Sequence, residues 1–376
     1  MKIKKFSQSI FTTRPILPPV KEFNVKIQKI WQSRMLANMG SQHRELEKKI
    51  TRLLKVPYCS LFNNGTVALM IAIKSLELKG EVITTPFTFP ASLTSLTWNN
   101  ISPVFCDTDP NTLTIDANKI ESLITNKTTG ILGVHVYGNP CDVKKIDKIA
   151  KKHKLKIIYD AAHAFGAEIN NVGIGNFGDI TMFSFHATKL FHTAEGGALT
   201  YKDKNLGQKL YLLKNFGIRN EEEVVLPGIN GKMNEIQAAL GLTVLKLFEK
   251  ERKKRGKIRK IYNHFLNKTT GISLIDYPSN LVNSNQYFII RINTKKFGIS
   301  RDEVYERFKK YNLFARKYFY PLCSSYPFYK NLPSASRNNL PNAYKASSEV
   351  LALPFYGELT DHEIEKICLI LLSFRK

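Results

Sequence analysis

The segment Asp179-Ile-Thr-Met-Phe-Ser-Phe-His-Ala-Thr-Lys-Leu-Phe-His-Thr-Ala-Glu-Gly-Gly197 decides the fold that we predict for this chain. Its first part, from Ile180 to Phe185, is apolar and β-prone, and it leads into a polar turn that carries Lys189. In open α/β folds the strand ends carry the chemistry, so this pattern places Lys189 at a ligand-binding edge. A lysine fixed there can form a Schiff base with a carbonyl compound. Taken alone, the segment is equally compatible with Lys189 as a solvated surface cation.

Short apolar runs and helical patterns alternate on the N-terminal side of this segment. Strands are expected at residues 59–62, 81–85, 103–106, 130–136 and 156–159, and helices at 20–31, 43–54, 66–78, 91–98, 116–124 and 143–153. This alternation predicts an α/β fold in which helices flank a mostly parallel central sheet. The residues at the strand ends are then expected to converge on Lys189: Thr66, Phe89, Asp160, His163 and Ser184.

The pattern changes after Gly197. Helices are expected at 206–215 and, as one long helix, at 234–259. From Gly271 onward the pattern is α+β, with strands at 273–275 and 287–292 and helices at 301–310 and 361–373. We therefore predict a large domain of residues 1–250 and a smaller α+β domain of residues 251–376. The N-terminal arm and helix, residues 1–35, are expected to pack on the smaller domain.

The composition restricts the class of protein. The chain has 376 residues with 56 Lys and Arg against 31 Asp and Glu, a formal charge of +25. These cations are spread along the whole chain, which argues against a nucleic-acid partner and favours steering of a phosphorylated substrate. No apolar run approaches the ~20 residues of a membrane span, and no signal peptide is recognisable, so we expect no membrane partner. The five scattered cysteines include no CxxC pair, which argues against disulfides and a metal site and favours a cytoplasmic location.

Asp160, Lys189 and the Gly65-Thr66 helix start together suit pyridoxal 5′-phosphate (PLP). This cofactor needs an amine for its carbonyl, a carboxylate for its ring nitrogen and donors for its phosphate. Each residue also has a structural interpretation: Asp160 as a helix N-cap, Thr66 as a simple cap, and His163 and Phe89 as core residues.

Six motifs occur in order along the first two thirds of the chain. They are Asn64–Leu69, Thr84–Phe89, Val134–Gly138, Asp160–Gly166, Ser184–Lys189 with Glu195–Gly197, and Asn230–Ala239, and Ala315–Pro321 extends the set. Together they resemble the DegT/DnrJ/EryC1/StrS family of nucleotide-sugar aminotransferases. The resemblance implies an aspartate-aminotransferase-like fold (PLP fold type I), PLP as cofactor, and a homodimer with two shared active sites.

The resemblance also implies a role for each matching residue. Lys189 matches the Schiff-base lysine, Asp160 the partner of the pyridinium nitrogen, and His163 a residue near the cofactor phenolate. The remaining cofactor positions are Gly65, Thr66 and Ser184 for the phosphate, Phe89 for ring stacking, and Asn230 for the phosphate of the neighbouring subunit. Arg316, Lys317, Tyr318 and His186 are our candidates for substrate binding. Pro90, Ser92 and Asn215-Phe-Gly217 depart from the common family pattern without removing a catalytic group.

The implied reaction is transamination of a nucleotide-linked keto-6-deoxyhexose in deoxyamino sugar biosynthesis, for example for O-antigen lipopolysaccharide. L-glutamate would donate its amino group to C4 of dTDP-4-keto-6-deoxyglucose and leave as 2-oxoglutarate. An alternative is amination at C3 of a dTDP-3-keto-6-deoxyhexose. A sugar dehydratase of the same fold would carry histidine in place of Lys189, and a regulatory homologue would be expected to lack Lys189 or Asp160.

Overall fold

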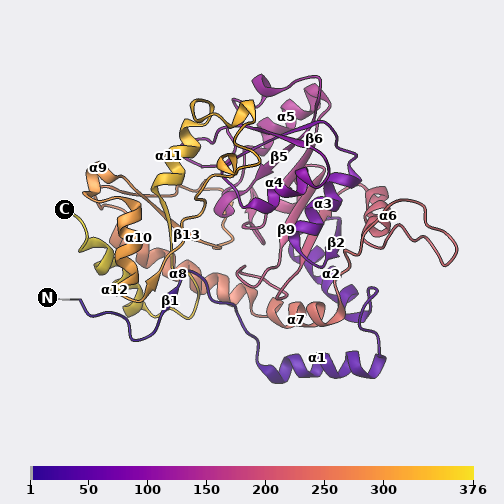
Figure 1. Cartoon of the computed structure of the whole chain (residues 1–376). Coiled ribbons are helices and arrows are strands. Elements are labelled where there is room, and N and C mark those ends of the chain that lie inside the picture. The colour runs from indigo at the N-terminus through magenta and orange to yellow at the C-terminus, as the bar shows by residue number, and fades with distance from the viewer. Residues whose placement is uncertain (1–2) are drawn as a thin grey trace.

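The computed structural model describes residues 3–376, and its main feature is a seven-stranded sheet (Figure 1). In spatial order the strands are β2 (Tyr58–Phe62), β10 (Gly197–Tyr201), β9 (Ile180–Ser184), β6 (Lys156–Asp160), β5 (Thr128–Val134), β3 (Glu81–Thr84) and β4 (Ser102–Phe105). The strands β9, β6, β5, β3 and β4 run parallel, and β10 is antiparallel to both of its neighbours. The predicted mostly parallel sheet is therefore confirmed.

Helices cover both faces of this sheet. In β6, Ile158 packs into the cluster that contains α3 (Gly65–Ser75) and α4 (Pro90–Thr97). The adjacent Ile157 packs with α5 (Val143–His153) on the other face. Because successive side chains of a strand point to opposite faces, a sheet buried on both sides requires this nearly continuous apolar sequence.

The segments near the N-terminus lie along two different parts of the molecule. Strand β1 (Ile10–Phe11) pairs in parallel with β14 (Leu313–Phe314), so the arm reaches the C-terminal region. Helix α1 (Val20–Ser33) instead runs along α7 (Glu235–Leu245), within the residues assigned to the large domain (Figure 1). This placement of α1 differs from the prediction that the whole of 1–35 packs on the smaller domain, of which residues 1 and 2 lie outside the described residues.

The C-terminal region has its own core around an antiparallel sheet. The sheet consists of β11 (Ile272–Leu274), β13 (Phe288–Ile292) and β15 (Val350–Leu353), and the nearby helices are α8 (Phe248–Leu266), α9 (Thr294–Phe297), α10 (Arg301–Lys309), α11 (Pro341–Glu349) and α12 (Asp361–Leu372). In α8, Phe248 packs with the large sheet's helices, whereas Tyr262 packs with the C-terminal sheet. We propose the domain boundary near residue 250 on the basis of this change of partners within α8.

The remaining elements complete the described fold. Helices α2 (Ser41–Leu53) and α6 (Lys204–Leu213) flank the large sheet near β2. Strands β7 (Glu168–Ile169), β8 (Val172–Gly173) and β12 (Leu281–Val282) form a small separate sheet. Among residues 3–376, no helix is both long and apolar enough to cross a membrane.

Two predicted helices are wrong. The segment 116–124 contains only a short 3-10 turn at Glu121–Leu123, because the Asp116 carboxylate accepts a hydrogen bond from the Asn118 N–H and holds a turn there. The expected long helix from 234 to 259 is two helices, α7 and α8. The second helix begins at the buried Phe248, which packs against Phe165 with ring centres 5.2 Å apart.

Candidate active site

A cavity of about 400 Å³ lies at the carboxyl ends of β5, β6 and β9, beside the N-termini of α3 and α4. Its wall contains most of the residues that the sequence singled out: Gly65, Thr66, Phe89, Asp160, His163, Ser184, His186, Lys189, Arg316 and Tyr318. Thr88, Tyr287 and Phe319 also line it. The expected convergence of strand-end residues on Lys189 is therefore present in the structure, and the C-terminal region closes one side of the cavity.

Lys189 lies in the turn that follows β9, where its N–H donates to the carbonyl of His186 at 2.8 Å. Its Nζ is 5.9 Å from the centre of the Tyr287 ring. Burial lowers the pKa of the Lys189 amine, against the opposing effects of Tyr318 and Asp160. A larger share of the amine is therefore neutral near neutral pH than in an ordinary lysine, as a nucleophile requires.

Asp160 is the last residue of β6 and is only 5% exposed. Its Oδ2 accepts a hydrogen bond from the Ser92 hydroxyl at 2.7 Å, and its Oδ1 accepts one from the Ala162 N–H at 3.0 Å. Burial raises the pKa of Asp160, while these two donors and the Lys189 cation lower it. The cavity therefore contains both a carboxylate held by two hydrogen bonds and the amine of Lys189.

Ser92 is a site residue that sequence reasoning missed. In the sequence, Ser92 stands out only as a departure from the common family pattern. It lies in the first turn of α4, where its hydroxyl is fully buried between Thr88 and Asp160. No local signal could have found this role, because its partner Asp160 is 68 residues away in the sequence.

His163 is held as a neutral hydrogen-bond donor. Its Nδ1 accepts the N–H of Tyr137 at 3.1 Å, so the ring proton is assigned to Nε2. Burial lowers the pKa of His163 well below its usual range, and the nearby Lys189 lowers it further. The ring meets Tyr287 edge-on at 4.9 Å and stacks with Phe319 at 5.9 Å. Because His163 lines the cavity, its neutral form can offer one N–H to a ligand there.

The start of α3 forms a cradle suited to an anion. Asn64 is the N-cap residue, because its side chain accepts the Val67 N–H at 2.8 Å, so the prediction of Thr66 as the cap is wrong. The first N–H groups of a helix have no partner within the helix and attract negative charge. A Cβ on Gly65 would lie 3.0 Å from the Ser184 Cβ, so glycine lets the Ser184 hydroxyl approach this helix start.

The donor set of the cavity fits PLP. The carboxylate of Asp160 suits a protonated ring nitrogen, the amine of Lys189 a carbonyl, and the α3 N-terminus a phosphate. Phe89 lines the cavity and is 56% exposed, so it presents an aromatic surface to a ligand. Among the described residues, no cluster of His, Cys, Asp and Glu could hold a metal ion.

Two predicted site residues lie outside the cavity. Asn230 is on a loop where its carbonyl accepts a hydrogen bond from the Asn63 side chain at 3.3 Å. Lys317 forms an ion pair with Asp302 at 2.5 Å, and its Nζ is 4.4 Å from the centre of the Tyr305 ring. The structure therefore does not support Lys317 as a ligand for substrate in this cavity.

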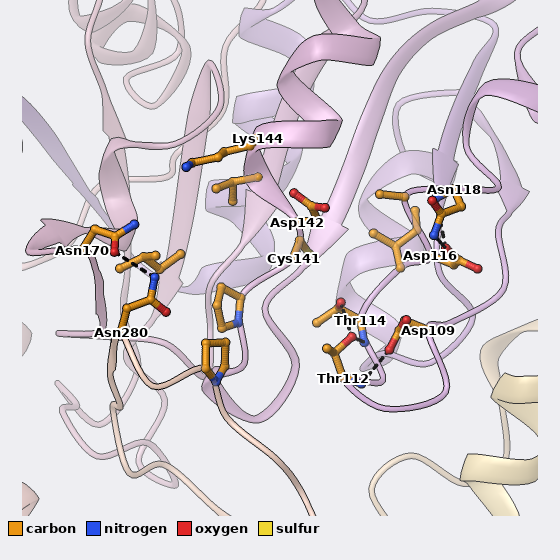
Figure 2. A pocket seen from close by; sticks show the side chains of 16 residues that line it. Asp109, Thr112, Thr114, Asp116, Asn118, Cys141, Asp142, Lys144, Asn170 and Asn280 are labelled. Carbon is orange, nitrogen blue, oxygen red and sulfur yellow. Dashed lines mark hydrogen bonds between the residues drawn. The ribbon is translucent and has the colours of Figure 1, made fainter.

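A second groove, of about 420 Å³, is separate from these residues (Figure 2). It lies between the 109–118 loop, the start of α5 and the Asn170 and Asn280 turns. Its polar side chains bond mainly to their own loops, as Asp109 does with the N–H groups of Asn111 and Thr112. We assign no chemistry to this groove.

Comparison with known proteins identifies the family. The model of the DegT/DnrJ/EryC1/StrS aminotransferase family matches residues 19–372. The chain belongs to this aminotransferase family. The family assignment confirms the predicted resemblance, the fold type, and a sugar aminotransferase that depends on PLP.

Individual members of the family are similar over nearly the whole chain. A dTDP-4-amino-4,6-dideoxy-D-glucose transaminase from Shigella dysenteriae is 44% identical over 95% of this chain and 97% of its own length. The enzyme of the same name from Escherichia coli is also 44% identical, over 97% of this chain and 99% of its own length. The crystal structure of DesI with its TDP-sugar product is 32% identical, covers 98% of this chain and 94% of its own, and superposes with a TM-score of 0.94.

Proposed function

We propose that this aminotransferase moves the amino group of L-glutamate to C4 of dTDP-4-keto-6-deoxyglucose, giving dTDP-4-amino-4,6-dideoxyglucose and 2-oxoglutarate. The observation that carries the proposal is the 44% identity, over nearly the full length of both chains, to two transaminases named for that product. The site supports it because the amine of Lys189 and the carboxylate of Asp160 face one cavity.

The chain's own residues would hold the cofactor at several points. Lys189 would bind its carbonyl, Asp160 its ring nitrogen and His163 its phenolate oxygen through Nε2–H. The phosphate would lie at the helix start formed by Gly65 and Thr66, beside the Ser184 hydroxyl, and Phe89 would cover one face of the ring. When bound, PLP supplies an electron sink that stabilises negative charge at the carbon next to the amine.

Lys189 would also move the proton in both halves of the reaction. Its depressed pKa allows the neutral amine to remove a proton from the α-carbon of glutamate, and the ammonium that this forms can give the proton up again. In the second half, the protonated form of the same group would deliver a proton to C4 of the sugar. Tyr318 lines the same cavity, and burial raises the pKa of its phenol to about 12. Tyr318 therefore stays protonated and can act only as a neutral hydrogen-bonding group toward the sugar.

The nucleotide sugar would enter at the exposed side of the cavity. His186 and Arg316 are both exposed there, and the His186 ring is oriented by a 2.8 Å hydrogen bond between its Nδ1 and the Thr188 hydroxyl. Arg316 presents a guanidinium, a group that suits phosphate oxygens. The formal charge of +25 would favour the approach of such an anionic substrate.

We further propose a cytoplasmic homodimer with shared active sites. Asn230 lies outside the cavity of its own chain, which fits a role at the phosphate of a partner subunit. Apolar side chains on the surrounding loop are exposed, with Phe216 at 46%, Val224 at 69% and Ile229 at 42%, as expected of a surface that packs on a second copy. The five cysteines are all free and buried, which suits a reducing compartment.

The proposal is tested by spectroscopy and by product analysis. The purified protein should show the visible absorbance of lysine-bound PLP, and Lys189→Ala should lack it. With the dTDP-4-keto sugar and L-glutamate, NMR of the product should place the new amine at C4. An amine at C3 would favour the C3-aminotransferase alternative, and a protein that stays colourless with added PLP would refute PLP-dependent catalysis.

A further inference from the structure

The segment 284–287, which precedes β13, contacts the active site from the C-terminal side. The Ser284 hydroxyl donates to the carbonyl of His163 at 2.7 Å. The Tyr287 ring meets both His163, at 4.9 Å, and the Lys189 Nζ, at 5.9 Å. Between them lies Gln286, only 2% exposed, which none of the predicted roles includes.

Gln286 binds the backbone on both sides of Lys189. Its Oε1 accepts the N–H of Leu190 at 2.7 Å, and its Nε2 donates to the carbonyl of Thr188 at 3.1 Å. A carboxamide offers a donor and an acceptor side by side, so one side chain can hold a carbonyl and an N–H that flank the same residue. The bond to Leu190 is buried and the bond to Thr188 is partly buried, so water cannot fully replace them when the amide is removed.

Gln286 is itself held from α8. Arg255, which is 1% exposed, has its Nη1 3.4 Å from the carbonyl of Gln286. The Arg255 Nε donates to the Oε1 of Glu251 at 2.9 Å, and this oxygen also accepts the N–H of Gly357 at 2.7 Å. A connected polar network therefore runs from the C-terminal region to the backbone of the lysine turn.

We propose that Gln286 is a positioning residue for Lys189. It fixes the Thr188–Leu190 backbone and thereby restricts the positions from which the amine of Lys189 can react with a carbonyl in the cavity. The geometry of the reacting atoms controls the rate of bond formation more strongly than it controls binding of the cofactor's ring and phosphate. This inference rests on the proposed role of Lys189 as the residue that binds PLP.

The experiment separates the covalent step from binding. Apo-protein is mixed with PLP, and the rate at which the lysine-bound absorbance appears is measured. Affinity for pyridoxamine phosphate is measured in parallel, because that molecule has the same ring and phosphate but no carbonyl for Lys189. Gln286→Met keeps the length of the side chain but loses both hydrogen bonds. The matched control is Asn285→Gly, which removes the neighbouring amide that bonds Arg252 and Arg259 at a residue with φ of 55°, where glycine is unstrained.

Gln286→Met should slow PLP capture by about tenfold or more, with affinity for pyridoxamine phosphate changed by less than about threefold. If this variant does not fold, as judged by its thermal unfolding, Gln286→Asn keeps the amide on a shorter side chain and should show a smaller slowing of the same kind.

Three results would overturn the inference: unchanged capture, an equal loss of capture and affinity, or an equal slowing by Asn285→Gly. A wild-type protein that captures no PLP would instead refute the proposed function.

Discussion

Replacing Ser92 by alanine tests whether the Ser92 hydroxyl stabilises the charged form of Asp160. The Ser92 hydroxyl donates to Asp160 at 2.7 Å, and Asp160 is 5% exposed, so solvent screens this bond little. Hydrogen bonds to buried charged groups contribute about 1.5–3 kcal/mol. Since the Ala162 N–H and the Lys189 amine still support the carboxylate, we expect a loss near 1.5 kcal/mol, which is about tenfold in PLP affinity.

The loss should depend on pH in a defined direction. Without the Ser92 hydroxyl, the pKa of Asp160 rises further above its ordinary value, because burial is then less compensated. A larger fraction of Asp160 is then protonated at acid pH and cannot pair with a protonated ring nitrogen. The defect in PLP affinity should therefore be largest at mildly acidic pH and decline as the pH rises.

The assay is a titration of apo-protein with PLP across this pH range. Ser95→Ala is the matched control, because its buried hydroxyl lies on the same helix but donates to the Ser92 carbonyl at 3.0 Å and does not touch Asp160. Ser92→Thr should retain affinity, since the hydroxyl remains. If Ser92→Ala and Ser95→Ala behave alike, or if the defect does not vary with pH, the reasoning about Asp160 is refuted.

Three further predictions concern the lysines and the subunit interface. Because burial lowers the pKa of Lys189, the rate of PLP capture should rise with pH and level off below the ordinary lysine value of about 10.4; a plateau no earlier than that of a free lysine derivative would contradict this. Lys189→Ala and Asn230→Ala should each be inactive or weak alone but recover activity when mixed, because a mixed dimer contains one complete site; absence of recovery in verified mixed dimers would argue against a shared site. Lys317→Ala should change KM for the nucleotide sugar by less than about threefold, since Lys317 is already paired with Asp302 outside the cavity, and a much larger KM would place it in the substrate site.

Local patterns predicted most of the elements around the site. Helix α5 begins and ends at the expected residues, and β6 and β9 appear where their apolar runs are. The errors occurred where tertiary contacts, and not the local spacing of apolar residues, set the conformation of the chain. Leu113, Ala117 and Ile120 are buried in an irregular segment, and their i, i+4, i+7 spacing imitates that of a helix. Phe248 lies at the start of a separate helix, α8, where it packs against Phe165.

The sequence by itself determined that Lys189 and Asp160 lie at one cavity, because they stand at the ends of apolar strands whose carboxyl ends meet at one edge of a parallel sheet. It also determined the family, through motifs that keep their order. Only the tertiary structure decided three contacts. Ser92 donates a hydrogen bond to Asp160, Gln286 binds the backbone on both sides of Lys189, and Lys317 forms an ion pair with Asp302. These relations join residues far apart in the chain or depend on which way a side chain turns. No local propensity encodes such pairings, because they depend on how complete elements pack.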